Sequence, residues 1–247
     1  MTLRDNIVLQ TTFDDFGVII LSYIGKKAII WGDSVAKGVV WDAERGRYAL
    51  AKPPAAEIVA EQTGIDVINH ARMGMTVSDG LNVVRRDLER GVQADIAVIE
   101  FGGNDCDFDW AQISAAPDEV HLPRTPANLF VDKLGEIVSL AQGAGMRPIL
   151  LTLPPINADK YFEFISRDGL SQANILHWLG DKNHIYRFHE RYSCMIGRVA
   201  QKFGCKLVDI RSAFLDEWNA MSMVCRDGIH PTPDGQRLIG SAIMASL

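Results

Sequence analysis

Five short apolar runs, separated by stretches with helical spacing, constrain the fold of this chain more than any other feature of its sequence. Runs of this length and composition are typical of buried strands, and none of them follows directly on another. They are KAIIW (27–31), IDVIN (65–69), DIAVIE (95–100), RPILLT (147–152) and CKLVD (205–209). Strands that alternate with helices favour a parallel sheet covered by helices, so we expect an α/β fold.

The clearest helical stretch covers residues 126–145 and ends at the sequence GAG. Its face is formed by Leu129, Leu134, Ile137, Val138 and Ala141. A length of 247 residues is typical of one α/β domain, so we expect a single domain over 1–247. For the N-terminal 24 residues the sequence predicts a hairpin or an extra edge strand that turns at DDFG.

Residues 154–191 interrupt the alternation of strands and helices. They carry six aromatic side chains among polar residues, without a clear strand: Tyr161, Phe162, Phe164, Trp178, Tyr186 and Phe188. We interpret this segment as an insertion or lid-like excursion with short helices. If it lies over the strand ends, it is the best candidate for a wall that determines substrate specificity.

Charge and composition exclude several classes of partner. The chain has 25 Lys and Arg against 31 Asp and Glu, a formal charge of −6, and offers no field that would attract nucleic acid. The apolar run 17–24 is too short to span a membrane, and acidic residues precede it, so we expect neither an anchor nor a signal peptide. Four cysteines without C-x-x-C spacing favour reduced thiols and a cytoplasmic protein.

Polar residues follow several of the strand-like runs, where open parallel sheets bind their ligands. Ser34 follows AIIW, Gly74 lies a few residues after DVIN, and GGND (102–105) follows AVIEF. A fourth cluster, RDGIHP (226–231), precedes a C-terminal helix whose start is marked by TPD (232–234). The sequence therefore predicts one site that is assembled from four separate segments.

The residue types in these segments fit nucleophilic catalysis. A serine hydroxyl needs a base within hydrogen-bond reach, and a third group must hold that base in the correct tautomer. Only two residues separate Asp227 from His230, so one turn can present the carboxylate to the imidazole and leave its other nitrogen facing Ser34. A backbone N–H at Gly74 and the side-chain amide of Asn104 are suitable donors for a developing oxyanion.

Together the segments GDSVAKG, NHARMGMT, GGND and DGIHP resemble the four blocks of the SGNH hydrolases, also called the GDSL esterase/lipase family. The resemblance implies that Ser34 is the nucleophile and that Asp227 and His230 complete a catalytic triad. It also implies an oxyanion hole formed by the Ser34 N–H, the Gly74 N–H and the Asn104 amide. The fold it implies is a flavodoxin-like, three-layer α/β/α sandwich with a central, mostly parallel five-stranded sheet, and no cofactor is required.

Two of the blocks depart from the family pattern. Val35 replaces the usual leucine after the serine, and Ala71 and Arg72 stand where glycine and a small residue are common. The better-known α/β-hydrolase elbow, G-x-S-x-G, is disfavoured because it would need glycine at the position of Ala36.

These features predict a serine esterase that hydrolyses a carboxylic ester with a small or medium acyl group, such as acetyl on a carbohydrate, through an acyl-enzyme. Lysophospholipids and thioesters are alternative substrates. A non-catalytic module that binds a small molecule or sugar on the same fold is the alternative function. We expect a small-molecule ester as the partner, and neither nucleic acid nor a membrane.

Other residues near the four blocks have both a functional and a structural interpretation. Candidates for substrate binding are Asp33, Arg72, Asp105, Phe108 and Trp110. Taken singly, Ser34 with Asp33 can cap a helix, Asn104 with Asp105 can form a turn, and the two aromatic residues can be core. Calcium binding at DCDFD is rejected because the sixth and twelfth positions are Trp110 and Ala116. The remaining histidines are expected to be structural or exposed: His70, His121, His177, His184 and His189.

Overall fold

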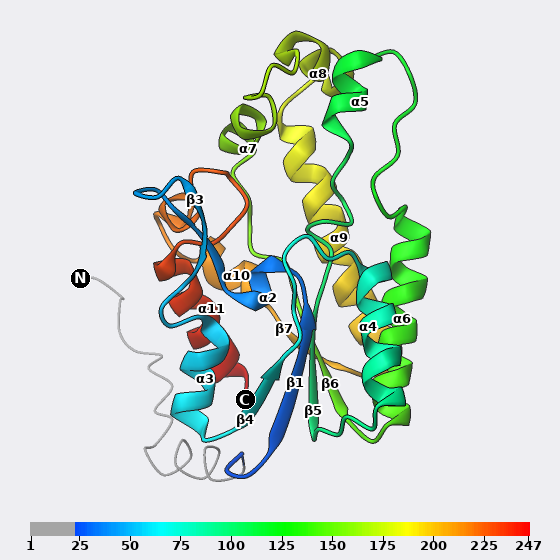
Figure 1. The fold of residues 1–247 in the computed structure, drawn as a ribbon, viewed down its shortest axis with the longest axis vertical. Helices are drawn as coiled ribbons and strands as arrows, with labels where there is room; N and C mark the ends of the chain where they lie inside the picture. The colour runs from blue at the N-terminus through cyan, green and yellow to red at the C-terminus, as the bar shows by residue number, and fades with distance from the viewer. Residues whose placement is uncertain (1–22) are drawn as a thin grey trace, which may run out of the picture.

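The computed structural model describes residues 23–247 and contains a five-stranded sheet with the strand order β4-β1-β5-β6-β7 (Figure 1). All neighbouring strands are parallel. The strands are β1 (Lys27–Gly32), β4 (Asp66–Asn69), β5 (Ile96–Glu100), β6 (Arg147–Leu151) and β7 (Lys206–Val208). All five predicted runs form these strands, so the predicted α/β sandwich is confirmed.

Helices cover both faces of the sheet. One layer contains α4 (Val77–Glu89), α6 (Ala127–Gly143) and the second half of α9 (Asn183–Phe203). The other contains α3 (Ala55–Thr63), α10 (Ile210–Leu215) and α11 (Pro233–Ser246). Side chains of one strand alternate between these layers, with Ile29 in the first core and Ala28 in the second, which explains why the strands read as unbroken apolar runs.

A smaller lobe lies beyond the carboxyl ends of the strands, at the top of Figure 1. It contains α5 (Trp110–Ala115), α7 (Ala158–Ile165), α8 (Gln172–Leu179) and the first half of α9. These helices pack around an aromatic cluster that includes Phe108, Trp110 and Phe162. The predicted excursion 154–191 accounts for α7, α8 and the start of α9, but α9 continues without a break to Phe203. Its second half packs on the sheet.

A two-stranded antiparallel hairpin, β2 (Val39–Asp42) and β3 (Arg47–Leu50), was not expected from the sequence. It follows α2 (Ser34–Lys37), which ends at Gly38 with a positive φ of 84°. Trp41 and Tyr48 face each other across the hairpin, with ring centroids 5.0 Å apart. A short 3₁₀ helix, η1 (Ala220–Met223), lies between α10 and α11. The predicted N-terminal hairpin falls almost entirely on residues 1–22, outside the described residues.

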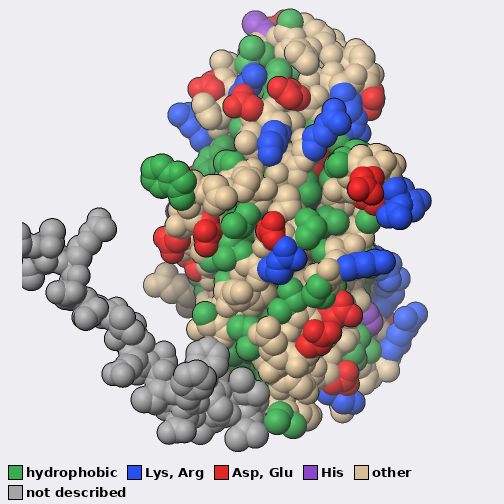
Figure 2. Space-filling view, turned by 90° about the vertical axis from the view of Figure 1, so that its left-hand side faces the viewer, with side chains coloured by type: hydrophobic (Ala, Val, Ile, Leu, Met, Phe, Trp, Pro, Cys, Tyr) green, Lys and Arg blue, Asp and Glu red, His purple; other side chains and the backbone are tan. Residues whose placement is uncertain are grey.

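The surface over the hairpin, α3 and α11 carries charges of both signs. In the described part of this face, Lys and Arg are interspersed with Asp and Glu (Figure 2). No helix within residues 23–247 has the length and apolar character needed to cross a membrane.

Gly80 on α4 tests how closely this helix packs on the sheet. A Cβ at Gly80 would lie 2.2 Å from the ring of Phe101, which is fully buried. We expect Gly80→Ala to lower the free energy of unfolding by about 1–3 kcal/mol, measured by urea denaturation. Gly197→Ala on α9 is the matched control, because its nearest contact is 3.7 Å and alanine there should stabilise by about 0.5–1 kcal/mol. Equal stability of the two variants would contradict the packing.

Candidate active site

Ser34 stands at the carboxyl end of β1, beside the end of β5. The backbone approach is close: a Cβ at Gly32 would lie 2.8 Å from the carbonyl oxygen of Glu100, so only glycine fits. Asp33 then caps α2 by accepting a hydrogen bond from the Val35 N–H at 2.8 Å, and Ser34 is the first helical residue. Asp33 therefore fills the capping role, and Ser34 is left to face the edge of the sheet.

Ser34, His230 and Asp227 form one chain of hydrogen bonds. His230 Nε2 lies 2.9 Å from Ser34 Oγ, and His230 Nδ1 lies 2.6 Å from Asp227 Oδ2. All three side chains are buried. The structure thus brings together the three residues that the sequence proposed as a triad, although Ser34 and His230 are 196 positions apart.

The Asp227 carboxylate determines the tautomer of His230. Burial would raise the pKa of Asp227, but hydrogen bonds from the His230 ring and from the N–H groups of Ile229 and His230 more than offset it and lower this pKa. An ionised carboxylate only accepts hydrogen bonds, so Nδ1 of His230 carries the proton. Nε2 is left with a lone pair directed at the Ser34 hydroxyl, as a general base requires.

The loop that carries Asp227 and His230 is held from several sides. The Cys225 N–H donates to the carbonyl of His230 at 2.8 Å. Gly228 has a positive φ of 82° and lies against the backbone of α7, where a Cβ would come within 2.4 Å of the Tyr161 nitrogen. The Tyr48 ring packs 4.9 Å from the imidazole of His230. The position of the imidazole therefore depends on the hairpin and on the upper lobe.

The residues that supply the three proposed oxyanion donors, Ser34, Gly74 and Asn104, line one cavity. Ser34 begins α2, so its N–H has no acceptor within the helix. Gly74 has a positive φ of 78° and open space around its Cα. Asn104 donates from Nδ2 to Asp33 Oδ2 at 3.1 Å and to the carbonyl of Met75 at 3.2 Å. An oxyanion would therefore have to share or replace one of these two bonds to receive the Asn104 amide.

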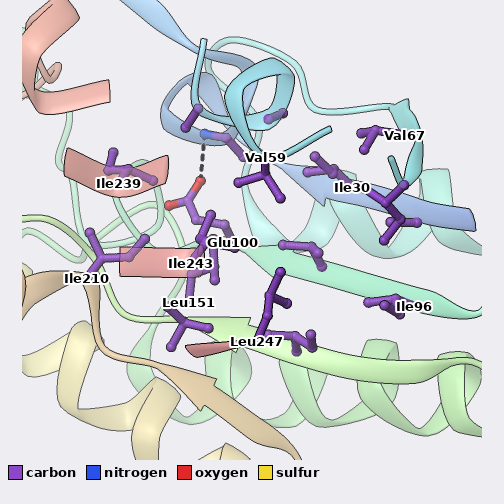
Figure 3. A pocket seen from close by; sticks show the side chains of 18 of the residues that line it. Ile30, Val59, Val67, Ile96, Glu100, Leu151, Ile210, Ile239, Ile243 and Leu247 are labelled. Atoms are coloured by element: carbon purple, nitrogen blue, oxygen red, sulfur yellow. Dashed lines mark hydrogen bonds between the residues drawn. The ribbon is translucent and has the colours of Figure 1, made fainter. Parts of the chain in front are cut away.

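Asp33 and Glu100 form a buried pair of carboxyl groups beneath α2. Each is 1% exposed, and the two are within hydrogen-bond contact of each other. Glu100 Oε2 accepts from the Ala36 N–H at 3.2 Å (Figure 3), while Oε1 is buried without a partner among residues 23–247. Burial raises the pKa of both groups, and the neighbouring Asp33 charge raises that of Glu100 further.

The surroundings of Glu100 prevent the carboxyl groups of Asp33 and Glu100 from being ionised at the same time. Aliphatic side chains, among them Ile30, Leu151 and Ile243, line an apolar cavity of about 70 Å³ between the sheet and the α3–α11 layer (Figure 3). They offer a charge no hydrogen bonds, and two adjacent buried carboxylates would repel each other. A proton that remains on Glu100 can be donated to Asp33, which in turn holds Val35 and Asn104.

The active-site cavity has a volume of about 160 Å³. On the side of the lobe its wall comes from the segment that the sequence singled out as a specificity wall. This part of the wall includes Pro154, Ile156, Tyr161, Ile185, Phe188 and His189, and Leu153 directly precedes it. Tyr48 and Met73 also line the cavity, although they were not singled out from the sequence.

Four of the five residues proposed for substrate binding do not line this cavity. Arg72 is exposed outside it. Asp105 is fully buried and accepts from the Val77 N–H at the start of α4, and burial raises its pKa to about 6. Phe108 and Trp110 belong to the aromatic core of the lobe. The fifth, Asp33, lines the cavity, but its carboxyl is occupied by Val35, Asn104 and Glu100.

Within residues 23–247, no group of three His, Cys, Asp or Glu side chains is arranged to hold a metal ion. The acidic residues at 105–109 form hydrogen bonds within the protein: Asp107 accepts from Tyr161 and Trp110, and Asp109 caps α5. The four cysteines are free thiols.

A serine, an imidazole and a carboxylate joined by hydrogen bonds at the carboxyl edge of a parallel α/β sandwich define a site of the serine-hydrolase class. Residues 30–238 match the GDSL-like lipase/acylhydrolase family, and the chain belongs to this family. It is thereby placed among enzymes that hydrolyse acyl esters.

Two curated relatives carry related descriptions. A GDSL esterase/lipase of Arabidopsis thaliana is 26% identical over 186 residues, which are 72% of this chain and 65% of the plant protein. The isoamyl acetate-hydrolyzing esterase of Saccharomyces cerevisiae is 22% identical over 225 residues, or 89% of this chain and 84% of the yeast protein. The chain thus spans slightly less than two thirds of the plant protein and most of the yeast one.

Solved structures share the fold. A lipase/acylhydrolase from Enterococcus faecalis aligns with a TM-score of 0.61 at 18% identity, covering 89% of this chain and 94% of its own. An acetyl-xylooligosaccharide esterase from Geobacillus aligns with a TM-score of 0.60 at 19% identity, covering 90% of this chain and 94% of its own. At these identities the likeness concerns the sandwich and not the substrate.

Glu100→Gln tests the shared proton beneath α2. A raised pKa means that the folded protein holds this proton more tightly than the unfolded chain, so stability is lost as pH rises above 4.5, the ordinary pKa of glutamate. Glutamine keeps a donor for Asp33 and cannot ionise. We therefore expect the melting temperature of the wild type to fall relative to Glu100→Gln as the pH rises above about 5. Glu136→Gln, an exposed site on α6, is the control. If the melting temperatures of the wild type and Glu100→Gln changed in parallel with pH, the shared proton between Asp33 and Glu100 would be contradicted.

Asn104→Ala tests the proposed oxyanion donor. We expect kcat for p-nitrophenyl acetate to fall about 10²–10³-fold with little change in KM, because the amide is needed only once charge develops on the carbonyl oxygen. Circular dichroism and thermal melting check that the variant is folded. A folded variant with kcat within a few-fold of the wild type would remove Asn104 from this role.

Proposed function

We propose that the protein is a serine esterase that hydrolyses a carboxylic ester of a small or medium acyl group through an acyl-enzyme. The observation that carries this proposal is the 2.9 Å contact between His230 Nε2 and Ser34 Oγ, with the opposite ring nitrogen held by Asp227. A helix cap at Ser34 and a turn at Asp227–His230 would not explain why the serine, the imidazole and the carboxylate are buried and joined by hydrogen bonds.

The proposed reaction uses the groups in the positions described. Ser34 Oγ attacks the ester carbonyl while His230 Nε2 takes its proton, and the N–H groups of Ser34 and Gly74 with the Asn104 amide receive the oxyanion. His230 then gives the proton to the departing alcohol. Water attacks the acyl-Ser34 ester by the same route and releases the acid. No cofactor takes part in these steps.

The size of the cavity favours a short acyl group. Its volume of about 160 Å³ is below the roughly 300–1,000 Å³ of pockets that hold drug-sized ligands. By their names, the yeast relative hydrolyses isoamyl acetate and the Geobacillus enzyme acts on acetyl-xylooligosaccharides. Acetyl esters, including acetylated carbohydrates, are therefore our first choice, ahead of lysophospholipids and long-chain thioesters.

Fluorophosphonate labelling separates the esterase from a non-catalytic binding module on the same fold. We expect one covalent adduct, located at Ser34 by peptide mass spectrometry, and its loss in Ser34→Ala and His230→Ala. Ser34→Ala should also lower kcat for p-nitrophenyl acetate by about 10⁶-fold, and Asp227→Asn by about 10⁴-fold, because the wrong tautomer of His230 cannot accept the serine proton. A folded wild-type protein that is inert to the label and to a series of p-nitrophenyl esters would favour the binding module.

We also propose that the protein works in the reducing environment of the cytoplasm. The proposal is supported by the four unpaired cysteines, of which Cys106 and Cys225 are buried. Burial raises the pKa of both thiols, which makes them poor candidates for redox chemistry.

A further inference from the structure

A second histidine, His189, lies in the wall of the active-site cavity. It is on α9, one turn after Ile185, and both residues line the cavity together with Phe188. Residues four apart on a helix share one face, so the side chains of Ile185 and His189 project toward the same region. His189 is buried, with only 6% of its surface exposed.

Arg211 fixes the tautomer of His189. Its Nη2 lies 2.9 Å from His189 Nδ1, and a guanidinium can only donate hydrogen bonds. Nδ1 is therefore the acceptor, and the ring proton is on Nε2. Burial and the charge of Arg211 lower the pKa of His189 to about 3, so the ring stays neutral.

Arg211 is itself held in place. Its Nε donates to Ser193 Oγ at 3.3 Å and its Nη1 donates to Tyr186 Oη at 2.9 Å. Arg211 is only 8% exposed, so these bonds are shielded from water. The imidazole of His189 is consequently supported by a rigid network behind the cavity wall.

His189 Nε2–H has no acceptor among the residues that the structure describes. Its neighbours in the wall, such as Ile156, Ile185 and Phe188, are apolar. Asp107 and Tyr161 also line the cavity, but they are bonded to each other at 2.7 Å. Nε2 is not among the fully buried atoms without a partner, so it opens onto the cavity. A substrate that excludes water from this point must offer an oxygen there, or leave the donor unpaired at a cost of about 1–3 kcal/mol.

We propose that His189 Nε2–H donates a hydrogen bond to an oxygen on the alcohol part of the substrate, and that the substrate is the ester of a polyhydroxylated alcohol such as a sugar. A simple alkyl ester has only two oxygens. In the proposed reaction the carbonyl oxygen faces the oxyanion donors and the other oxygen leaves with the proton from His230. Once the bound ester excludes water from Nε2, a third oxygen is needed to accept its hydrogen bond, and the hydroxyl or ring oxygens of a sugar supply it. This inference rests on the proposed esterase function.

The test compares two acetates of similar size in the wild type and in His189→Phe. One is a monoacetate of methyl xylopyranoside and the other is cyclohexyl acetate. We expect the wild type to favour the sugar ester in kcat/KM by roughly 10–100-fold, and His189→Phe to reduce this preference to near unity through a higher KM for the sugar ester. Cyclohexyl acetate should be hydrolysed within about threefold of the wild-type rate, because it makes no bond to Nε2.

Two further variants separate recognition from folding. His189→Gln retains an N–H donor near the position of Nε2 and should recover part of the preference for the sugar ester. His184→Phe, on the same helix but outside the cavity, should leave the preference unchanged. A folded His189→Phe variant that keeps the wild-type preference, or a wild type without any preference, would overturn the proposal.

A binding measurement distinguishes this proposal from the proposed function. Ser34→Ala does not turn over the ester, so calorimetric titration with the methyl xylopyranoside monoacetate reports binding alone. We expect His189→Phe in the Ser34→Ala background to weaken binding by about tenfold. If the wild type hydrolysed no ester while the tenfold loss was seen, the esterase would be wrong and the His189 contact would stand. Equal affinity of the two variants would overturn the contact.

Discussion

The hydrogen bond between His230 and Ser34 depends on the whole topology, because it joins residues 196 positions apart. Ser34 is delivered by β1, which lies between β4 and β5 within the sheet. His230 comes from the loop before α11, and that helix packs against α3 on the same side of the sheet. Any change in strand order would separate the two groups. The contact is therefore a property of the fold and not of the local sequence around either residue.

The sequence predicted the elements whose signals are local. The strands are apolar on both faces, Thr232 and Pro233 mark the start of α11, and three of the four blocks follow strand ends. It could not assign Asp105, whose side chain is the same whether it binds substrate or the Val77 N–H 28 positions earlier. The same limit applies to His189, whose role depends on Arg211 from a different element. The hairpin at 39–50 was missed because its strands pair only with each other, outside the five-stranded sheet, and RYAL does not form a buried apolar run.

The sandwich and the added segments contribute different parts of the site. The sandwich supplies Ser34, Gly74 and Asn104 at the ends of its strands, while the lobe and the hairpin add part of the surrounding wall. Tyr48 of the hairpin packs on the ring of His230, and Tyr161 of α7 lies beside the backbone of Gly228. Changes in these segments can alter the shape of the cavity without displacing a strand, which is how one fold accommodates different substrates.

The two buried histidines of the cavity illustrate how one side chain takes opposite roles. Asp227 accepts a hydrogen bond from His230 Nδ1, which leaves Nε2 as an acceptor for a serine proton. Arg211 donates to His189 Nδ1, which leaves Nε2 as a donor toward the cavity. In both cases the charge of the partner behind the ring determines the chemistry in front of it. If the carboxylate lay behind His189 and the guanidinium behind His230, the distances could stay similar. Nε2 of His230 would then be a donor that cannot accept the Ser34 proton, and Nε2 of His189 would be an acceptor in the cavity wall.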